Sequence, residues 1–404
     1  MKLNKNLNIW INYILFISVF VLSLQIRGIF FDGNIRNINF LAIIAIAFLL
    51  FYNKPNKHFY IFIFIFTSII MILSQLINNK GIVENIVVFS CIMFPSILLI
   101  INLSGEIFEK VFNIYLKFIN IISIILITTA IFDKVTGYGI ARFLANIFND
   151  RYFYDAVYYN NSIGRFYSFM GHPLYNAQIF LMFYIVNFFA KKYFKTGLNM
   201  IVVSIITMLG VLFTASKTAF VLLLICLIFF RPIKNKFIYV IFIILAIYFS
   251  INLGLFDPLI YRLKTQTLTS GRNEVWNIIT QMNIFPIKWF SGYGSGFNNL
   301  YNNYVTLASA AFEYPIRLFS LEYGRIFTIG LYTLICVYPI LKILLRKNIL
   351  ILLGFAIIFL DVNTYNAIGL GSDNMLMFIT FTYICINLSE YIFTKKNKSV
   401  NKSS

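Results

Sequence analysis

The sequence predicts an all-α integral membrane protein, a polytopic bundle of about twelve transmembrane helices with two large extracytoplasmic loops. Hydrophobic residues make up 60% of the 404 residues and charged residues only 12%. A soluble fold needs a polar exterior, which this composition cannot supply. Long apolar stretches recur along the whole chain, so we expect residues 1–404 to form a single membrane domain.

Stretches of about 20 mostly apolar residues mark the predicted spans, because that length crosses a bilayer as a helix. The first stretch lacks a small-residue cleavage site, so we expect a retained span and not a removed signal peptide. The predicted spans are 9–26, 38–52, 59–77, 86–103, 112–132, 173–190, 199–215, 218–230, 237–255, 324–345, 349–367 and 372–393.

The formal net charge of +19 is explained by membrane orientation. With both termini in the cytoplasm, most lysines fall in loops predicted to be cytoplasmic, as the positive-inside rule expects. We therefore expect no nucleic-acid partner. The abundance of Ile, Asn, Lys and Phe is typical of an AT-rich bacterial genome, so we expect a multi-pass protein of the bacterial cytoplasmic (inner) membrane.

Metal-binding and disulfide chemistry have little support in the sequence. The four cysteines lie singly inside apolar segments, where they are expected to act as small hydrophobic residues. Only two histidines, His58 and His172, are present. We expect neither a metal site nor a cofactor.

Two long polar segments, 133–172 and 256–323, are predicted to be the large outer loops. Both are rich in aromatic residues and punctuated by glycines, whereas a flexible linker would be rich in Gly, Ser or Pro. Apolar residues between Arg272 and Ile284 recur at near-helical spacing. These loops are therefore expected to fold, partly as amphipathic helices at the membrane interface.

Arginine and lysine are distributed differently. Nine of the eleven arginines fall in segments predicted to be outside, whereas most lysines fall inside. The guanidinium group can hold phosphate oxygens bidentately, so an outward surface rich in Arg suits an anionic, sugar-bearing substrate. The alternative is pairing with nearby acidic residues or lipid headgroups. The outward arginines are Arg27, Arg36, Arg142, Arg151, Arg165, Arg262, Arg272, Arg317 and Arg325.

Two polar turns precede predicted spans in the first half of the chain. Pro173 suits a first helical position, which places His172 at the mouth of a helix as a candidate catalytic residue or a plain hydrogen-bonding one. Gly171 would allow the backbone to approach a ligand closely. Lys217 lies in the turn Thr214–Thr218 between two short apolar segments, where it could bind substrate or extend to the interface.

The second long segment carries further candidates. The glycine-rich run Gly292–Gly296 could present backbone amides, although it lacks the context of a nucleotide-binding loop. Glu313, Arg317, Glu322 and Arg325 then alternate in sign just before a predicted span. Such a segment could transfer protons, and mutual salt bridges are the alternative.

Taken in order, these motifs resemble the O-antigen ligase and polymerase superfamily of bacterial membrane enzymes over about residues 160–345. The resemblance implies a multi-helix bundle that transfers sugar from undecaprenyl-diphosphate carriers at the outer membrane face, without metal or nucleotide. A flippase and a chain-length regulator are implied as partners, besides membrane lipid. The motifs are Gly164-Arg165…His172-Pro173, Ser216-Lys217, Gly271-Arg272…Trp276, Gly292-Tyr293-Gly294-Ser295-Gly296 and Glu322-Tyr323-Gly324.

The chain departs from the superfamily pattern in ways that favour one activity. Lys217 stands where Arg is usual, and the second long segment lacks the His-Asn pair typical of ligases, with Asn302, Asn303 and Tyr304 in that region. We therefore expect a metal-independent polysaccharide polymerase for O-antigen, capsule or exopolysaccharide. The alternatives are a ligase-like glycan transferase and a lipid-linked oligosaccharide flippase or transporter.

Roles for the candidate residues follow from this expected activity. The general base would be Glu322, Glu313 or His172. The substrate diphosphate would be held by Arg165, Lys217, Arg272, Arg317 and Arg325.

Overall fold

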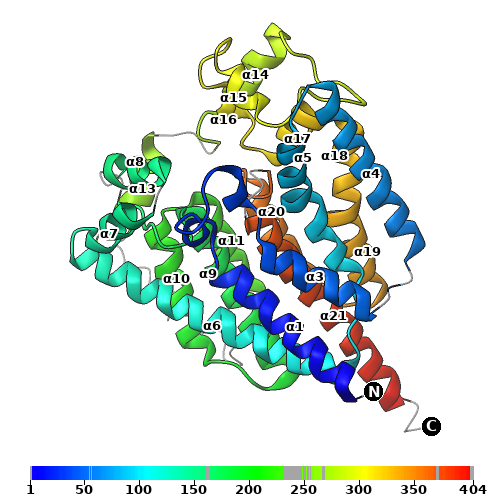
Figure 1. Cartoon of the computed structure of the whole chain (residues 1–404). Helices are drawn as coiled ribbons and strands as arrows, with labels where there is room; N and C mark the ends of the chain where they lie inside the picture. The colour runs from blue at the N-terminus through cyan, green and yellow to red at the C-terminus, as the bar shows by residue number, and fades with distance from the viewer. Residues whose placement is uncertain are drawn as a thin grey trace. The chain divides into compact units, whose positions relative to one another are not determined.

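A computed structural model describes residues 2–53, 55, 57–148, 150–160, 164–230, 248, 252, 254, 256–265, 269–369 and 373–400. Every regular element within these residues is helical, as predicted (Figure 1). The chain divides into two compact units. Unit 1 comprises residues 1–21, 32–112 and 269–404, and unit 2 comprises residues 22–31 and 113–268.

Unit 1 is built around α21, which is buried along most of its length. A helix that is apolar on all sides is stable only when other helices surround it, and α21 packs against α1, α19 and α20. The helices of unit 1 are α1 (Lys2–Phe20), α3 (Phe40–Asn53), α4 (His58–Ile77), α5 (Ile82–Val88), α14 (Arg272–Met282), α15 (Phe297–Tyr301), α16 (Ala308–Ala311), α17 (Pro315–Tyr323), α18 (Arg325–Tyr332), α19 (Tyr338–Leu345), α20 (Ile349–Asn363) and α21 (Asp373–Val400).

Unit 2 is built around α9, another helix that is buried on all sides and packs against α10 and α11. The long helix α6 begins in unit 1 and continues through unit 2. The helices of unit 2 are α2 (Leu24–Arg27), most of α6 (Gly105–Val135), α7 (Gly139–Ile147), α8 (Arg151–Asn160), α9 (Pro173–Phe189), α10 (Met200–Thr214), α11 (Lys217–Phe229) and α13 (Asp257–Thr265).

Within the described residues, six helices are long and apolar enough to cross a membrane, namely His58–Ile77, Ile82–Ile100, Gly105–Val135, Pro173–Phe194, Arg325–Leu345 and Asp373–Asn397. Three of them continue an α-helix through π- or 3-10-helical turns, which are Phe89–Met93 and Phe94–Ile100 after α5, Ala190–Phe194 after α9, and Thr333–Val337 between α18 and α19. Several of the six helices expose large apolar side chains, such as Phe59 at 76% and Phe62 at 66% on α4. Surface of that kind is stable in lipid and not in water. The helices therefore indicate a membrane protein, as the composition predicts.

Five shorter apolar helices coincide with further predicted spans, namely Asn6–Phe20, Phe40–Asn53, Met200–Thr214, Lys217–Phe229 and Ile349–Asn363. Four of them, at 13 to 15 residues, are shorter than the roughly 17–25 residues of a typical span, whereas Asn6–Phe20 is the apolar part of α1, which has 19 residues. The remaining predicted span, 237–255, lies outside the described residues except for 248, 252 and 254.

The segments predicted to be long loops contain short helices. The amphipathic segment predicted from Arg272 onward is α14, and it lies with α15 and α16 at one end of unit 1, next to α17 (Figure 1). Ile279, Tyr301 and Phe312 form part of a small hydrophobic core that these helices share. The second segment is therefore folded, as its aromatic content predicts.

Candidate active site

The glycine-rich run and the Glu-x-Gly motif, about thirty residues apart in sequence, fold against each other in unit 1. The amide of Tyr293 donates to the carbonyl of Leu321 (3.0 Å), and that of Gly294 donates to the carbonyl of Glu322 (2.9 Å). A Cβ on Gly292 would lie 2.1 Å from the Glu322 carbonyl carbon, so only glycine fits there. Gly324 has a φ of +93°, a conformation that favours glycine. The two motifs therefore form one structural unit.

This packing buries the side chain of Glu322, which is 4% exposed. Its Oε1 accepts a hydrogen bond from the Gly296 amide at 2.7 Å. Burial raises the pKa of the Glu322 carboxyl to about 8, although Gly296, Lys80 and Asn298 act in the opposite direction. The carboxyl is therefore mostly protonated near pH 7. Because its pKa is close to neutral pH, a small change in its surroundings can shift it to the ionised form.

The amides of the glycine-rich run are satisfied within the protein. The Gly292 amide donates to the Ser74 hydroxyl (2.9 Å), and the Ser295 amide donates to Oε1 of Gln75 (3.0 Å). Together with the bonds of Tyr293, Gly294 and Gly296, these contacts use all five amides of the run. The run therefore holds Glu322 in place and is not an open anion cradle.

The start of α5 and the turn before it contribute an ion pair beside this run. Lys80 Nζ lies 3.4 Å from Glu84 Oε1, and the Ser295 hydroxyl donates to the same carboxylate. The carboxylate of Glu84 thus has both a charge partner and a hydroxyl donor. Lys80 and Glu84 are not among the residues selected from the sequence.

Glu84, Ser295 and Glu322 help to line a cavity of about 240 Å³, hereafter the Glu322 cavity. Ligand pockets for drug-sized molecules are about 300–1,000 Å³, so this one suits a smaller group. Its polar lining comes from carboxyl and carboxamide groups, and its apolar lining from valine, isoleucine and leucine. The lining residues are Asn37, Glu84, Val87, Val88, Ile92, Ser295, Gly296, Asn298, Asn299, Leu318, Glu322, Tyr323, Asn366 and Gly369.

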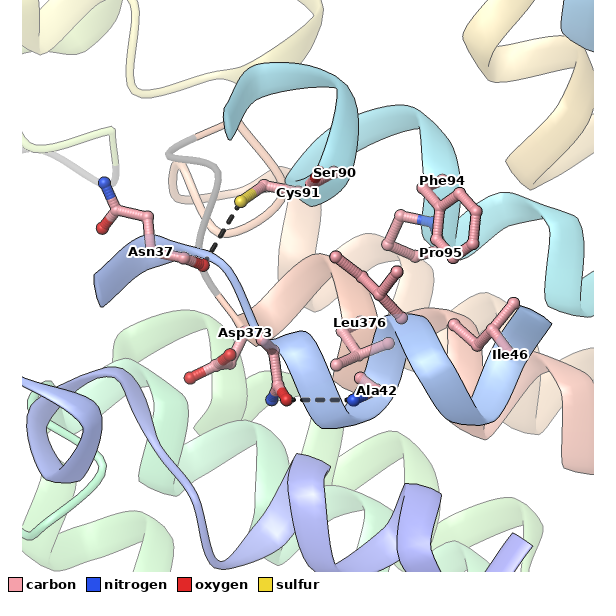
Figure 2. Close-up of a pocket in the computed structure, with 11 residues that line it drawn as sticks. Asn37, Ala42, Ile46, Ser90, Cys91, Phe94, Pro95, Asp373 and Leu376 are labelled. Carbon is pink, nitrogen blue, oxygen red and sulfur yellow. Dashed lines mark hydrogen bonds between the residues drawn. The ribbon is translucent and has the colours of Figure 1, made fainter. Parts of the chain in front are cut away.

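Asn37 also borders a second, smaller pocket of about 20 Å³, which has room for about one water molecule. Figure 2 shows the thiol of Cys91 directed toward the backbone carbonyl of Asn37, to which it donates at 3.3 Å. Asp373 and Leu376 close the pocket from α21. The cysteine has a hydrogen-bonding role here, and all four cysteines are free, as predicted.

A cluster of guanidinium groups and aromatic rings lies at the N-terminal end of α14. Nε of Arg272 donates to Glu313 Oε2 at 2.7 Å, Nη2 bonds to the same oxygen, and Nη1 donates to the carbonyl of Thr364 at 3.0 Å. The Arg317 guanidinium lies 4.5 Å from the centre of the Trp276 ring and 4.6 Å from that of the Tyr314 ring. The structure therefore brings together Arg272, Glu313 and Arg317.

Arg325 occupies the first position of α18. Its guanidinium lies 5.0 Å from the centre of the Trp289 ring, and its side chain is exposed. Its amide donates to the carbonyl of Lys288. Arg325 thus lies beside the glycine-rich run that follows Trp289.

The candidates Arg165, Lys217 and His172 belong to unit 2. Nε of Arg165 donates to the carbonyl of Thr214 (3.0 Å), and Nη1 of Arg262 donates to the carbonyl of Ala215 (2.7 Å). These carbonyls lie at the C-terminal end of α10, where the helix leaves acceptors unsatisfied. Lys217 is half-buried at the first position of α11.

His172 is the N-cap of α9, and Pro173 is its first residue, as predicted. Nδ1 of His172 accepts a hydrogen bond from the Leu174 amide at 3.2 Å. Burial, with the nearby charges of Arg165 and Arg262, lowers the pKa of His172 to about 3. The space beside Gly171, where a ligand was expected, is occupied by the side chain of Gln25.

The candidates thus fall into two groups, with Glu322, Glu313, Arg272, Arg317 and Arg325 in unit 1 and His172, Arg165 and Lys217 in unit 2. Sequence reasoning missed Glu84 and the asparagines that line the Glu322 cavity. The sequence signal for Glu84 was weak, because it is a single acidic residue near a predicted outer loop. Among the described residues, no group of three or more His, Cys, Asp or Glu side chains could hold a metal ion.

No protein-family model, curated protein or solved structure matches this chain.

Proposed function

We propose that this chain is a polysaccharide polymerase, a membrane glycosyltransferase that joins undecaprenyl-diphosphate-linked oligosaccharide repeat units. The observation that carries the proposal is the buried Glu322 carboxyl, which lines a polar cavity and has a pKa raised to about 8. Buried carboxyls with shifted pKa values in clefts are frequent at catalytic sites. Two of the five motifs on which the resemblance to the polymerase superfamily rests line this cavity, namely the glycine-rich run and Glu322-Tyr323-Gly324.

In the proposed reaction, a hydroxyl of the acceptor sugar attacks the anomeric carbon of the donor. The bond from that carbon to the diphosphate oxygen breaks, and undecaprenyl diphosphate leaves with the bonding electrons. The acceptor hydroxyl loses its proton to a base, for which Glu322 in its ionised form is the best placed candidate. A base with a pKa near the working pH is the most effective, because it accepts and returns the proton readily.

The leaving diphosphate needs positive charge around it. Arg272 and Arg317 lie together in unit 1, and Arg272 already presents its guanidinium fork to a carboxylate oxygen of Glu313. The Glu313 side chain is 44% exposed, so a phosphate could take its place at that fork. We propose that Arg272 exchanges Glu313 for the donor diphosphate and that Arg317 adds charge beside it.

The proposed location is the bacterial cytoplasmic membrane, with both termini in the cytoplasm and the Glu322 cavity at the outer face. In this arrangement the five shorter apolar helices also cross the bilayer, and residues 133–172 and 256–323 are extracytoplasmic. The repeat unit is delivered to that face by a flippase, and a chain-length regulator is a further proposed partner.

The test uses purified full-length protein and undecaprenyl-diphosphate-linked repeat units as the only sugar source. A polymerase takes the same lipid-linked unit as donor and acceptor, so the product should be a ladder of longer chains. We expect the ladder without nucleotide sugar, without ATP and with a chelator present. A ligase would consume the unit only with a distinct acceptor, and a transporter would move it across a vesicle with its length unchanged. Either outcome, in place of a ladder, would refute the proposal.

A further inference from the structure

The Glu322 cavity has more polar groups than a single proton transfer requires. Its lining includes the carboxamides of Asn37, Asn298, Asn299 and Asn366, besides two carboxyl groups. Apolar side chains, among them Leu318, form the rest of the wall. Carboxamides beside an apolar surface match a sugar ring, which has hydroxyls at its edge and C–H groups on its faces.

The charges around the cavity nearly cancel. The Glu84 carboxylate is paired with Lys80 and bonded to the Ser295 hydroxyl. The Glu322 carboxyl is mostly protonated near pH 7 because burial raises its pKa. No arginine is among the lining residues. Among the described lining residues, a negatively charged group would meet carboxyl groups and no cation, and a metal ion would find Glu84 already paired.

One lining group has an unsatisfied acceptor in the part of the chain that the structure describes. The Asn366 side chain is 8% exposed, and its Oδ1 has no hydrogen-bond partner among the described residues. Leaving a buried acceptor unpaired costs about 1–3 kcal/mol, so a donor from a ligand is favoured at this position. A sugar hydroxyl or the N–H of an acetamido group supplies that donor.

The cavity wall and the arginine cluster use residues that are close in sequence at two places. Arg272 donates to the carbonyl of Thr364, two residues before Asn366. Leu318 in the cavity wall follows Arg317 on α17. A ligand with an uncharged ring and a phosphate could therefore use both places.

We propose that the Glu322 cavity is a subsite for one uncharged sugar residue, held by Asn366, Asn298 and Asn299 through its hydroxyl or acetamido groups. The subsite rests on the proposed function, because the sugar belongs to the lipid-linked repeat unit. It adds a selectivity: acidic sugars such as uronic acids are excluded from this position. The sugar at this position is therefore neutral, whatever the rest of the repeat unit contains.

The test measures binding of methyl glycosides, which are not substrates, to full-length protein in detergent by saturation-transfer difference NMR. Titrations should show binding of methyl glucoside and methyl N-acetylglucosaminide, and a Kd for methyl glucuronide that is at least about tenfold higher, which corresponds to about 1.4 kcal/mol. Asn366→Ala removes the carboxamide that would accept from the sugar, and should weaken binding of the neutral glycosides by about tenfold. Asn303→Ala, at an exposed asparagine that does not line the cavity, is the matched control.

A second variant keeps the test decisive if Asn366→Ala does not fold. Asn299 is exposed and lines the cavity, so Asn299→Ala should fold and weaken binding of the neutral glycosides more than the control does. Equal binding of methyl glucuronide, no binding of any glycoside, or competition by calcium ions would overturn the proposal. A failed chain-extension assay with selective glycoside binding would refute the polymerase and retain the subsite. A ladder of longer chains without selective glycoside binding would support the polymerase and refute the subsite.

Discussion

Arg165 in unit 2 and Arg272 in unit 1 are the same type of residue in similar Gly-Arg motifs, yet they bond to different kinds of partner. Arg165 donates to a backbone carbonyl at the end of α10, a group that no ligand can move. Arg272 donates chiefly to the Glu313 side chain, which is partly exposed and can be replaced. An arginine that stabilises a helix end and one that can exchange its anion are indistinguishable in sequence.

The carboxyl and imidazole candidates differ in a parallel way. Burial raises the pKa of Glu322 toward the working pH range, whereas burial and two guanidinium groups lower the pKa of His172 away from it. Glu322 also lines a cavity, and His172 uses Nδ1 to cap α9. Unit 1 therefore holds the residues with properties suited to catalysis, and the unit 2 residues have contacts suited to stability.

The largest effect that would sharpen this comparison is expected for Glu322→Gln. Gln can still accept the Gly296 amide but cannot take up a proton, so the chain-extension rate should fall about 10²–10⁴-fold while the protein stays folded. The measurement is the initial rate of ladder formation with lipid-linked repeat units. Glu109→Gln, at an exposed glutamate bonded to Tyr391, is the control. A rate within about threefold of wild type would remove Glu322 from the chemistry.

The same variant tests the pKa of Glu322 through stability. The pKa is raised from 4.5 in the unfolded chain to about 8, so the folded state holds the proton more tightly. Its contribution to stability is therefore fully present below about pH 4.5 and is lost as the pH rises through about 8. Thermal unfolding in detergent at several pH values should show this decline in wild type. The difference in stability between wild type and Glu322→Gln at each pH should isolate the contribution of Glu322.

The next largest effect concerns the guanidinium fork of Arg272. Lysine cannot make its three contacts at once, so Arg272→Lys should lower the extension rate by at least about tenfold, nearly as much as Arg272→Ala. The double variant Arg272→Met, Glu313→Gln removes the charge pair without leaving a lone charge. Compared with Arg272→Ala, this double variant should regain stability but not chain-extension activity. Recovery of both would mean that the ion pair is only structural.

Much of the fold follows from local sequence, because hydropathy acts within one helix. The apolar segments 59–77, 173–190 and 324–345 all coincide with helices in the structure. Pro173 and the polar turn around Lys217 also mark helix boundaries correctly. Span boundaries were less predictable, since the first span, predicted over 9–26, ends as a helix at Phe20.

The site was predictable only in part, because its contacts are distant in sequence. Glu322 was selected for its charge and its place before a helix, but its burial depends on Gly292 and Gly296. Glu84 meets Ser295 across more than two hundred residues, a pairing that one sequence does not reveal. The backbone carbonyls that accept from Arg165 and Arg262 are invisible in sequence for the same reason.

A smaller effect is expected for Arg165 in unit 2. If it mainly satisfies the Thr214 carbonyl, Arg165→Gln should cost about 0.5–1.5 kcal/mol of unfolding free energy and change the extension rate per folded molecule by less than about threefold. Thermal unfolding and the extension assay on the same preparation separate the two. Arg142→Gln, at an exposed arginine of α7, is the matched control. A stable variant with no activity would place Arg165 at the substrate after all.

The smallest effect is expected for His172→Asn, since asparagine is among the best N-cap residues and can accept the Leu174 amide in place of Nδ1. Stability near pH 7 should therefore stay within about 0.5 kcal/mol of wild type, whereas His172→Ala should lose about 1 kcal/mol. The folded pKa of about 3 lies below the unfolded value of 6.5, so the stability contributed by neutral His172 is present above about pH 6.5 and is lost as the pH falls toward 3. Asparagine should abolish that dependence of stability on pH.

The chain-extension rate gives a second test of His172. Because His172 stays neutral between pH 5 and 8, the pH–rate profiles of wild type and His172→Asn should have the same shape near pH 6.5. A loss of activity in His172→Asn with unchanged stability would instead make His172 a participant in catalysis and end the division of roles between the two units.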